Sequence, residues 1–193
     1  MERDLQSWTP LAIFQINVAK RWYERGLNSK DNFAKFFFYF AGFNALYFLW
    51  GRVDDVRNQQ DKPAGEEKQI HNLLKKFNSD EANEILTEVK VIVDYLQHRR
   101  PIQRMDIRDI DRQINGCDTE GKKWQSKLIK SELPEKKLLA LGSILYLIRS
   151  NLVHGSKAES GDDEKIIDNS VSALEIILNK SLLISKRELL FEG

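Results

Sequence analysis

Residues 36–51 read FFFYFAGFNALYFLWG, a charge-free stretch that we expect at the centre of the fold. As an α-helix it would extend about 24 Å, which is shorter than the roughly 30 Å hydrocarbon layer of a bilayer. Lys35 and Arg52 flank the stretch, and Asn44 lies in its middle. We therefore predict a buried core helix, one that a subunit partner can share, and keep a membrane span as the alternative.

Helical periodicity continues on the amino-terminal side. Thr9-Pro10 predicts a helix start, because a capping hydroxyl precedes a proline at the first helical position. The apolar face of this helix is expected to hold Leu11, Phe14, Val18 and Trp22. Gly26 is expected at its end. The central helix should then begin near Ser29 or Asp31 and run to about Trp50.

The middle of the chain alternates between loops and helices. Residues 51–65 are polar and predict a loop, and residues 66–77 predict a short helix. Asn78-Ser79-Asp80-Glu81 has the spacing of a capping box. One helix is expected to follow it and to stop at Arg99-Arg100-Pro101. Residues 102–114 predict a further short helix, and residues 115–118 a loop.

Two strong helical patterns occupy the last third. Pro134-Glu135 begins one of them, and its expected apolar stripe holds Leu138, Leu141, Leu145 and Ile148. An acidic loop, residues 158–164, leads to the last helix. Since no strand alternation, repeat or domain linker is found, we predict an all-α up-and-down bundle with additional helices. A single domain is expected to span residues 1–193.

Composition limits the class of protein. Hydrophobic residues make up 41% and charged residues 31%, the balance of a soluble globular chain. The net charge of +1 means that a surface for polyanions has to be local. Cys117 is the single cysteine, which fits a reducing cytoplasm, and the charged amino terminus has no signal-like apolar core. One cysteine and three scattered histidines give no zinc-ligand spacing, so no metal or cofactor is expected.

The chemistry-bearing stretch is Ile148-Arg149-Ser150-Asn151-Leu152-Val153-His154-Gly155. Histidine titrates near neutrality, so His154 can take the proton of a ribose 2′-hydroxyl, and the Arg149 guanidinium can hold the adjacent phosphate. Ser150 and Asn151 can orient the histidine or bind phosphate oxygens. Arg149 and His154 would lie about 140° apart on an ideal helix, so a helix end at Gly155 has to bring them together. Ordinary helix capping is the competing interpretation.

Residues 146–157 resemble the signature of the HEPN superfamily, especially its Apea-like members. That signature is an apolar helix leading into Arg, polar residues, two apolar residues, His and often Gly. The aromatic stretch 40–47 is also similar to an early helix of such proteins. The resemblance implies a HEPN-like helical bundle that forms a homodimer, with two motifs in one composite cleft and no metal.

The same resemblance implies an endoribonuclease that leaves a 2′,3′-cyclic phosphate and a 5′-hydroxyl. His154 would be the acid/base, Arg149 the phosphate clamp, and Ser150 and Asn151 supporting residues. Toxin–antitoxin or antiviral defence, with an antitoxin or other regulatory partner, is the implied setting. Ser150 stands where Asn or Asp is frequent, and Ser156 stands where some members carry a modified tyrosine. A non-catalytic RNA-binding, protein-interaction or dimerisation module of the same fold is the alternative.

Basic residues concentrate between positions 98 and 137, where eleven Lys and Arg face seven Asp and Glu. The candidate RNA-binding residues are Arg99, Arg100, Arg104, Arg108, Lys122, Lys123 and Trp124. For the arginines we favour the alternative of a solvated helix, because Asp106, Asp109 and Asp111 are interleaved with them. Trp124 can stack on a base, or it can pack its own helix onto the core while the neighbouring lysines stay in water.

Overall fold

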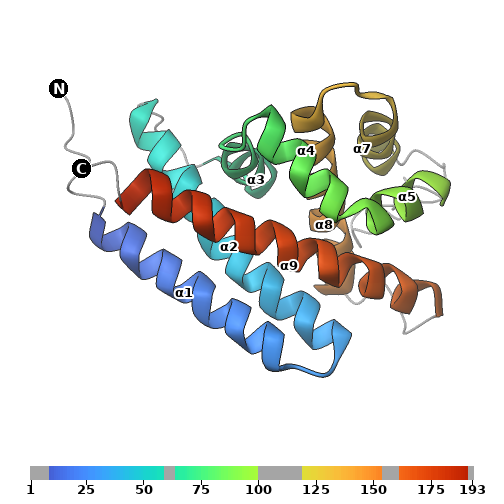
Figure 1. Ribbon diagram of the computed structural model, residues 1–193, viewed down its shortest axis with the longest axis horizontal. Helices are drawn as coiled ribbons and strands as arrows, with labels where there is room; N and C mark the ends of the chain where they lie inside the picture. Colours follow the sequence, from blue (N-terminus) through green and yellow to red (C-terminus); the bar gives the residue numbers. More distant parts are fainter. Residues whose placement is uncertain (1–8, 59–63, 100–118, 154–160, 191–193) are drawn as a thin grey trace. The chain divides into compact units, whose positions relative to one another are not determined.

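The computed structural model describes residues 9–58, 64–99, 119–153 and 161–190 (Figure 1). Across these four ranges every regular element is an α-helix and no strand occurs, which confirms the all-α prediction. The chain divides into two compact units, the first made of Met1–Lys76 with Leu174–Gly193 and the second of Phe77–Ala173. The single domain spanning residues 1–193 stays a prediction.

Unit 1 is built around a helical hairpin. Its helices are α1 (Thr9–Asn28), α2 (Asn32–Arg57), α3 (Glu66–Leu74) and the second part of α9 (Gly161–Leu190). Figure 1 shows α1 and α2 running antiparallel, with α9 beside them. Asp31 starts α2 as its N-cap, because its carboxylate accepts a hydrogen bond of 2.6 Å from the backbone N–H of Ala34.

The charge-free stretch is the core of unit 1, as predicted. Its fully buried side chains include Phe36, Tyr39, Phe43, Leu46, Tyr47 and Trp50. Phe43 and Tyr47 meet edge to face with ring centroids 5.5 Å apart, whereas Phe36 and Phe40 are stacked. Among the described helices none is both long enough and apolar enough to cross a membrane.

Two hydrogen bonds tie α2 to α9. The indole N–H of Trp50 donates to the Ser185 hydroxyl at 3.0 Å, and both side chains are buried. The Tyr39 hydroxyl donates to a Glu175 carboxylate oxygen at 3.0 Å. Burial, together with the negative charge of Glu175, raises the pKa of Tyr39 above its ordinary value. Tyr39 therefore stays a neutral donor in this contact.

The apolar face of α1 is displaced from the predicted one, because Leu11, Val18 and Trp22 are only half-buried. The buried residues are the small Ala12 and Ala19 with Ile16, whereas Phe14 is 58% exposed. Gly26 does not end the helix, which continues to Asn28. A Cβ on Gly26 would come within 2.1 Å of the Tyr39 ring. Small residues are therefore required on the face where α1 approaches the aromatic rings of α2.

The predicted loop at residues 51–65 starts too early. α2 continues to Arg57, and Val53 and Asp55 on its last turns are buried. Lys76 stabilises this extension, because its ammonium lies 3.2 Å from an Asp54 carboxylate oxygen and 4.5 Å from the Trp50 ring centroid. The short helix expected at residues 66–77 is confirmed as α3, which ends at Leu74.

Unit 2 holds α4 (Ser79–Glu88), α5 (Lys90–His98), α7 (Thr119–Lys130), α8 (Pro134–Val153) and the first part of α9. The capping box is confirmed: the Asn78 side chain accepts from the Glu81 N–H at 2.9 Å, and the Glu81 carboxylate accepts from the Asn78 N–H at 3.0 Å. The single helix predicted after it is wrong, since it breaks at Val89, whose ψ is 19°.

α8 is the central helix of unit 2. Its predicted stripe, Leu138, Leu141, Leu145 and Ile148, is buried as expected. α8 packs against α4 and α7, and Ser79 at the start of α4 donates a hydrogen bond to Glu135 in the first turn of α8. α9 begins at Gly161, inside the predicted loop 158–164. The helix predicted at residues 102–114 and the loop at 115–118 lie outside the described residues.

Candidate functional site

The described part of the predicted cleavage motif, residues 148–153, lies at the end of α8. Arg149 is half-buried, and Val153 at the end of the helix is 52% exposed. The helix thus delivers the arginine to the surface of unit 2, at the position where the chain leaves the core. His154 and Gly155, which complete the motif, lie outside the described residues, so the spacing between Arg149 and His154 stays a prediction.

The two polar residues between them are buried. Ser150 is 6% exposed and Asn151 is 1% exposed. Ser143, about two turns earlier on the same face as Ser150, is also buried at 1%. Since buried polar side chains are normally hydrogen-bonded, this arrangement fits an orienting role for Ser150 and Asn151 better than direct contact with a phosphate.

Arg99 and α7 belong to one packed region of unit 2. Gln125 on α7 donates from its side-chain amide to the carbonyl oxygens of Leu96 at 2.6 Å and Arg99 at 2.7 Å. These bonds satisfy carbonyl groups at the end of α5 and hold α7 beside it. Arg99 lies over the Tyr95 ring at 5.4 Å and donates to its hydroxyl at 3.2 Å.

Trp124 packs into the core rather than forming a platform. It is 5% exposed, and the ammonium groups of Lys123 and Lys127 each lie 4.4 Å from its ring centroid. Cation–π contact of this kind stabilises the two lysines over the ring. Of the two interpretations given for Trp124, the structure agrees with packing of its own helix onto the core and not with an exposed base-stacking platform.

The outer side of α7 is a lysine face, formed by Lys123, Lys127 and Lys130. The three lie within about 60° of one another around the helix axis and span about 10.5 Å along it. All three are exposed, as is Lys122, and none forms an ion pair with a carboxylate within the described ranges. Sequence analysis missed Lys130, although its spacing of seven from Lys123 was the available signal.

The remaining candidate residues lie outside the described residues or at the end of α5. Arg100, Arg104 and Arg108 lie outside the described residues. His98 is exposed at the end of α5, with Nδ1 2.7 Å from the Asp94 carbonyl oxygen, which is a helix-end arrangement. In the part of the chain that the structure describes, no group of three or more His, Cys, Asp and Glu side chains is placed to hold a metal ion.

The resulting arrangement can attract and hold a polyanion. Exposed lysines attract phosphates without requiring a particular orientation of the phosphate. An arginine at a helix end can bind a phosphate through its planar fork of donors. Both features belong to unit 2, and α7 packs directly against α8.

Comparison of the chain with family models, with curated proteins and with solved structures gives no match. The functional conclusion therefore depends on the motif and on the geometry of unit 2.

Proposed function

We propose that the protein is a metal-independent endoribonuclease of the HEPN type. The observation that carries the proposal is the position of Arg149, half-buried on the last turn of α8, in the same unit as the lysine face of α7. A strand of RNA needs both parts: dispersed positive charge to hold its backbone, and a guanidinium at the phosphate that reacts.

In the proposed reaction the ribose 2′-oxygen attacks the adjacent phosphorus while His154 takes its proton. The bond from phosphorus to the 5′-oxygen then breaks, and that oxygen receives a proton from the acid form of a histidine. The products are a 2′,3′-cyclic phosphate and a 5′-hydroxyl. Arg149 stabilises the charge on the phosphoryl oxygens.

A homodimer is part of the same proposal. Two copies of the motif facing one cleft would supply a base and an acid at once, which a single histidine cannot do in one step. Control by an antitoxin or another regulatory partner, a defence role and a cytoplasmic location also belong to the proposal.

RNA cleavage by purified protein in EDTA tests it, with wild type compared with Arg149→Ala and His154→Ala. We expect both variants to lose at least a hundredfold in rate, as for removal of a general base or an electrostatic stabiliser. His98→Ala and Arg187→Ala are matched controls, because both residues are exposed. Equal cleavage by all five proteins would contradict the assignment.

A non-catalytic RNA-binding module is the second candidate, and the lysine face of α7 favours it specifically. It predicts salt-sensitive RNA binding that His154→Ala leaves unchanged, with no cleavage by the wild type. Measuring binding and cleavage on the same preparations separates the two functions.

A further inference from the structure

A second cationic surface lies in unit 1, where α1 ends and α2 begins. An open pocket of about 510 Å³ is lined there by Arg21, Glu24, Arg25, Asn28, Ser29 and Phe38. This volume is in the range of small-molecule sites. None of the residues discussed for RNA cleavage contributes to it.

The walls of the pocket are held by close packing of the two helices. Trp22 on α1 and Phe38 on α2 are stacked, with ring centroids 5.7 Å apart and an interplanar angle of 23°. Gly26 lets the Tyr39 ring approach the α1 backbone closely beside them. The aromatic wall is therefore fixed before any ligand arrives, which reduces the entropy that binding would cost.

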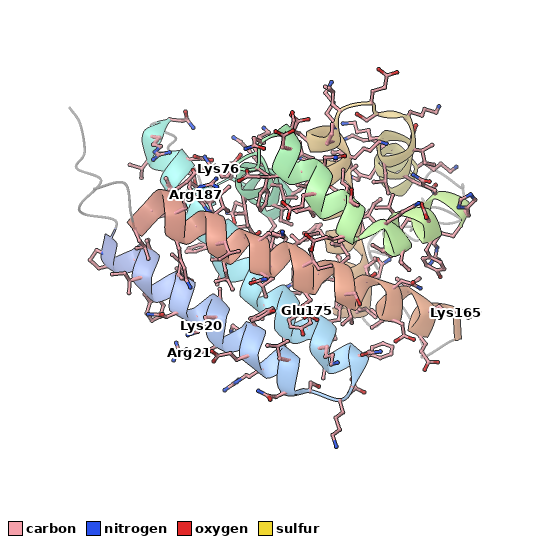
Figure 2. The ribbon with its side chains drawn as sticks, in the orientation of Figure 1. Lys20, Arg21, Lys76, Lys165, Glu175 and Arg187 are labelled. Atoms are coloured by element: carbon pink, nitrogen blue, oxygen red, sulfur yellow. The ribbon has the colours of Figure 1, made fainter. Side chains whose placement is uncertain are left out.

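The charge in the pocket is positive and available. Glu24, the one carboxylate among the lining residues, lies 3.7 Å from the ammonium of Lys20. Arg21 and Arg25 are exposed, and neither forms an ion pair with a carboxylate in the part of the chain described. Figure 2 shows Lys20 and Arg21 projecting from the outer side of α1. The guanidinium groups of Arg21 and Arg25 are therefore available to bind an anion.

The surroundings of Arg25 suit phosphate binding. Its guanidinium carbon lies 4.8 Å from the centroid of the Trp22 ring, a cation–π contact that uses none of its N–H groups in an ion pair. A guanidinium carries five N–H donors in one plane, the geometry that matches phosphate oxygens. Asn28 donates its amide to the Glu24 carbonyl oxygen at 2.9 Å, which leaves its own side-chain oxygen to accept from a ligand hydroxyl or amine.

From these features we infer that the α1–α2 pocket binds a nucleoside phosphate. The phosphate is held by Arg21 and Arg25, and the flat base lies against Phe38. The ligand is either a free nucleotide or one residue of an RNA strand, since both present the same phosphate and ring. The inference depends on unit 1 alone and stands whether or not His154 cleaves RNA.

Calorimetric titration with AMP and with inorganic phosphate at low ionic strength tests the pocket. The variant is the double substitution Arg21→Ala with Arg25→Ala, and its control is Lys186→Ala with Arg187→Ala, which removes the same charge elsewhere in unit 1. Loss of charge-assisted hydrogen bonds should weaken AMP binding roughly tenfold or more in the variant and leave the control unchanged. Thermal unfolding of both proteins verifies that they are folded.

A second arm uses a short fluorescent single-stranded RNA on a His154→Ala background, so that no cleavage intervenes. If the double variant binds RNA tenfold more weakly and the wild type does not bind AMP, the pocket binds one residue of an RNA strand. If the double variant binds AMP more weakly, the pocket binds a free nucleotide. Either result supports the inference. The substitution Phe38→Leu should weaken the binding of AMP more than the binding of inorganic phosphate. Equal affinities of variant and control for both AMP and RNA would overturn the inference, and equal wild-type affinities for AMP and phosphate would overturn the assignment of the base.

Discussion

Neutralising the lysine face of α7 should change how RNA binding responds to salt. The variant is the triple substitution of Lys123, Lys127 and Lys130 to glutamine, which removes the three charges and keeps two of the four methylenes of each side chain. These side chains are exposed and lack carboxylate partners within the described ranges, so each is available for one phosphate. The change is tested on a His154→Ala background to prevent cleavage.

The magnitude follows from counterion release. Each phosphate contact on a single strand contributes about 0.7 to the slope of log K against log salt, so loss of three contacts should reduce the slope by about 2. Between 50 and 200 mM salt the parent protein should then lose roughly fifteenfold more affinity than the variant. Because Trp124 and Leu128 stay in place, α7 should keep its packing on α8.

Fluorescence anisotropy with a short single-stranded RNA measures the slope. The control substitutes three exposed lysines from different helices or turns, Lys75, Lys90 and Lys165, and removes the same total charge. We expect the control to alter the slope by less than half as much as the α7 variant. Identical slopes for variant and control would refute the idea that α7 contacts the backbone of RNA.

Two further predictions concern the fold, each with an internal control. Ser185→Ala leaves the buried Trp50 N–H without its acceptor and should lower the free energy of unfolding by about 1–3 kcal/mol, whereas Ser181→Ala, at a buried hydroxyl with no hydrogen-bond partner in the described residues, should be neutral or stabilising. Chemical denaturation compares them, and equal losses would show that the indole bond contributes nothing. Gly26→Ala forces a methyl group onto the Tyr39 ring and should cost about 1–3 kcal/mol, while Gly65→Ala, which meets no atom within 4 Å, should change stability by less than about 1 kcal/mol. A melting temperature for Gly26→Ala as high as that of Gly65→Ala would contradict the close packing of α1 on α2.

Sequence periodicity predicted the helices whose buried face carries the larger side chains. The stripe of α8 from Leu138 to Ile148 is the plainest case, because its leucines recur at helical spacing and become the core. α1 shows the opposite. Its large apolar residues suggested one face, but the buried face holds the small residues Ala12, Ala19 and Gly26 together with Ile16. The sequence of one helix does not reveal how closely a second helix packs against it.

Breaks and extensions of helices were hidden for related reasons. Apolar residues continue through Val89 with no proline or glycine nearby, so nothing in the pattern marks the end of α4. The charged residues after Gly51 suggested a loop, but α2 continues there, and Asp54 forms an ion pair with Lys76, which is distant in sequence. Both outcomes depend on partners distant in sequence.

The candidate site was predictable in its residue types and only partly in its arrangement. The motif placed Arg149 at a helix end, where the structure also has it. The junction between Arg99 and α7 depends on Gln125, which contacts a carbonyl group 26 positions away. No local pattern indicates such a contact. Burial of Asn151 and Trp124 likewise follows from tertiary packing.

In the proposed reaction Arg149 and His154 cleave RNA by attack of the 2′-hydroxyl without a metal ion. The chemistry of the product ends after incubation in EDTA tests this. We expect 2′,3′-cyclic phosphate and 5′-hydroxyl ends with wild type, and neither above background with His154→Ala. Products bearing a 5′-phosphate, or the same cyclic ends from His154→Ala at the wild-type rate, would contradict it.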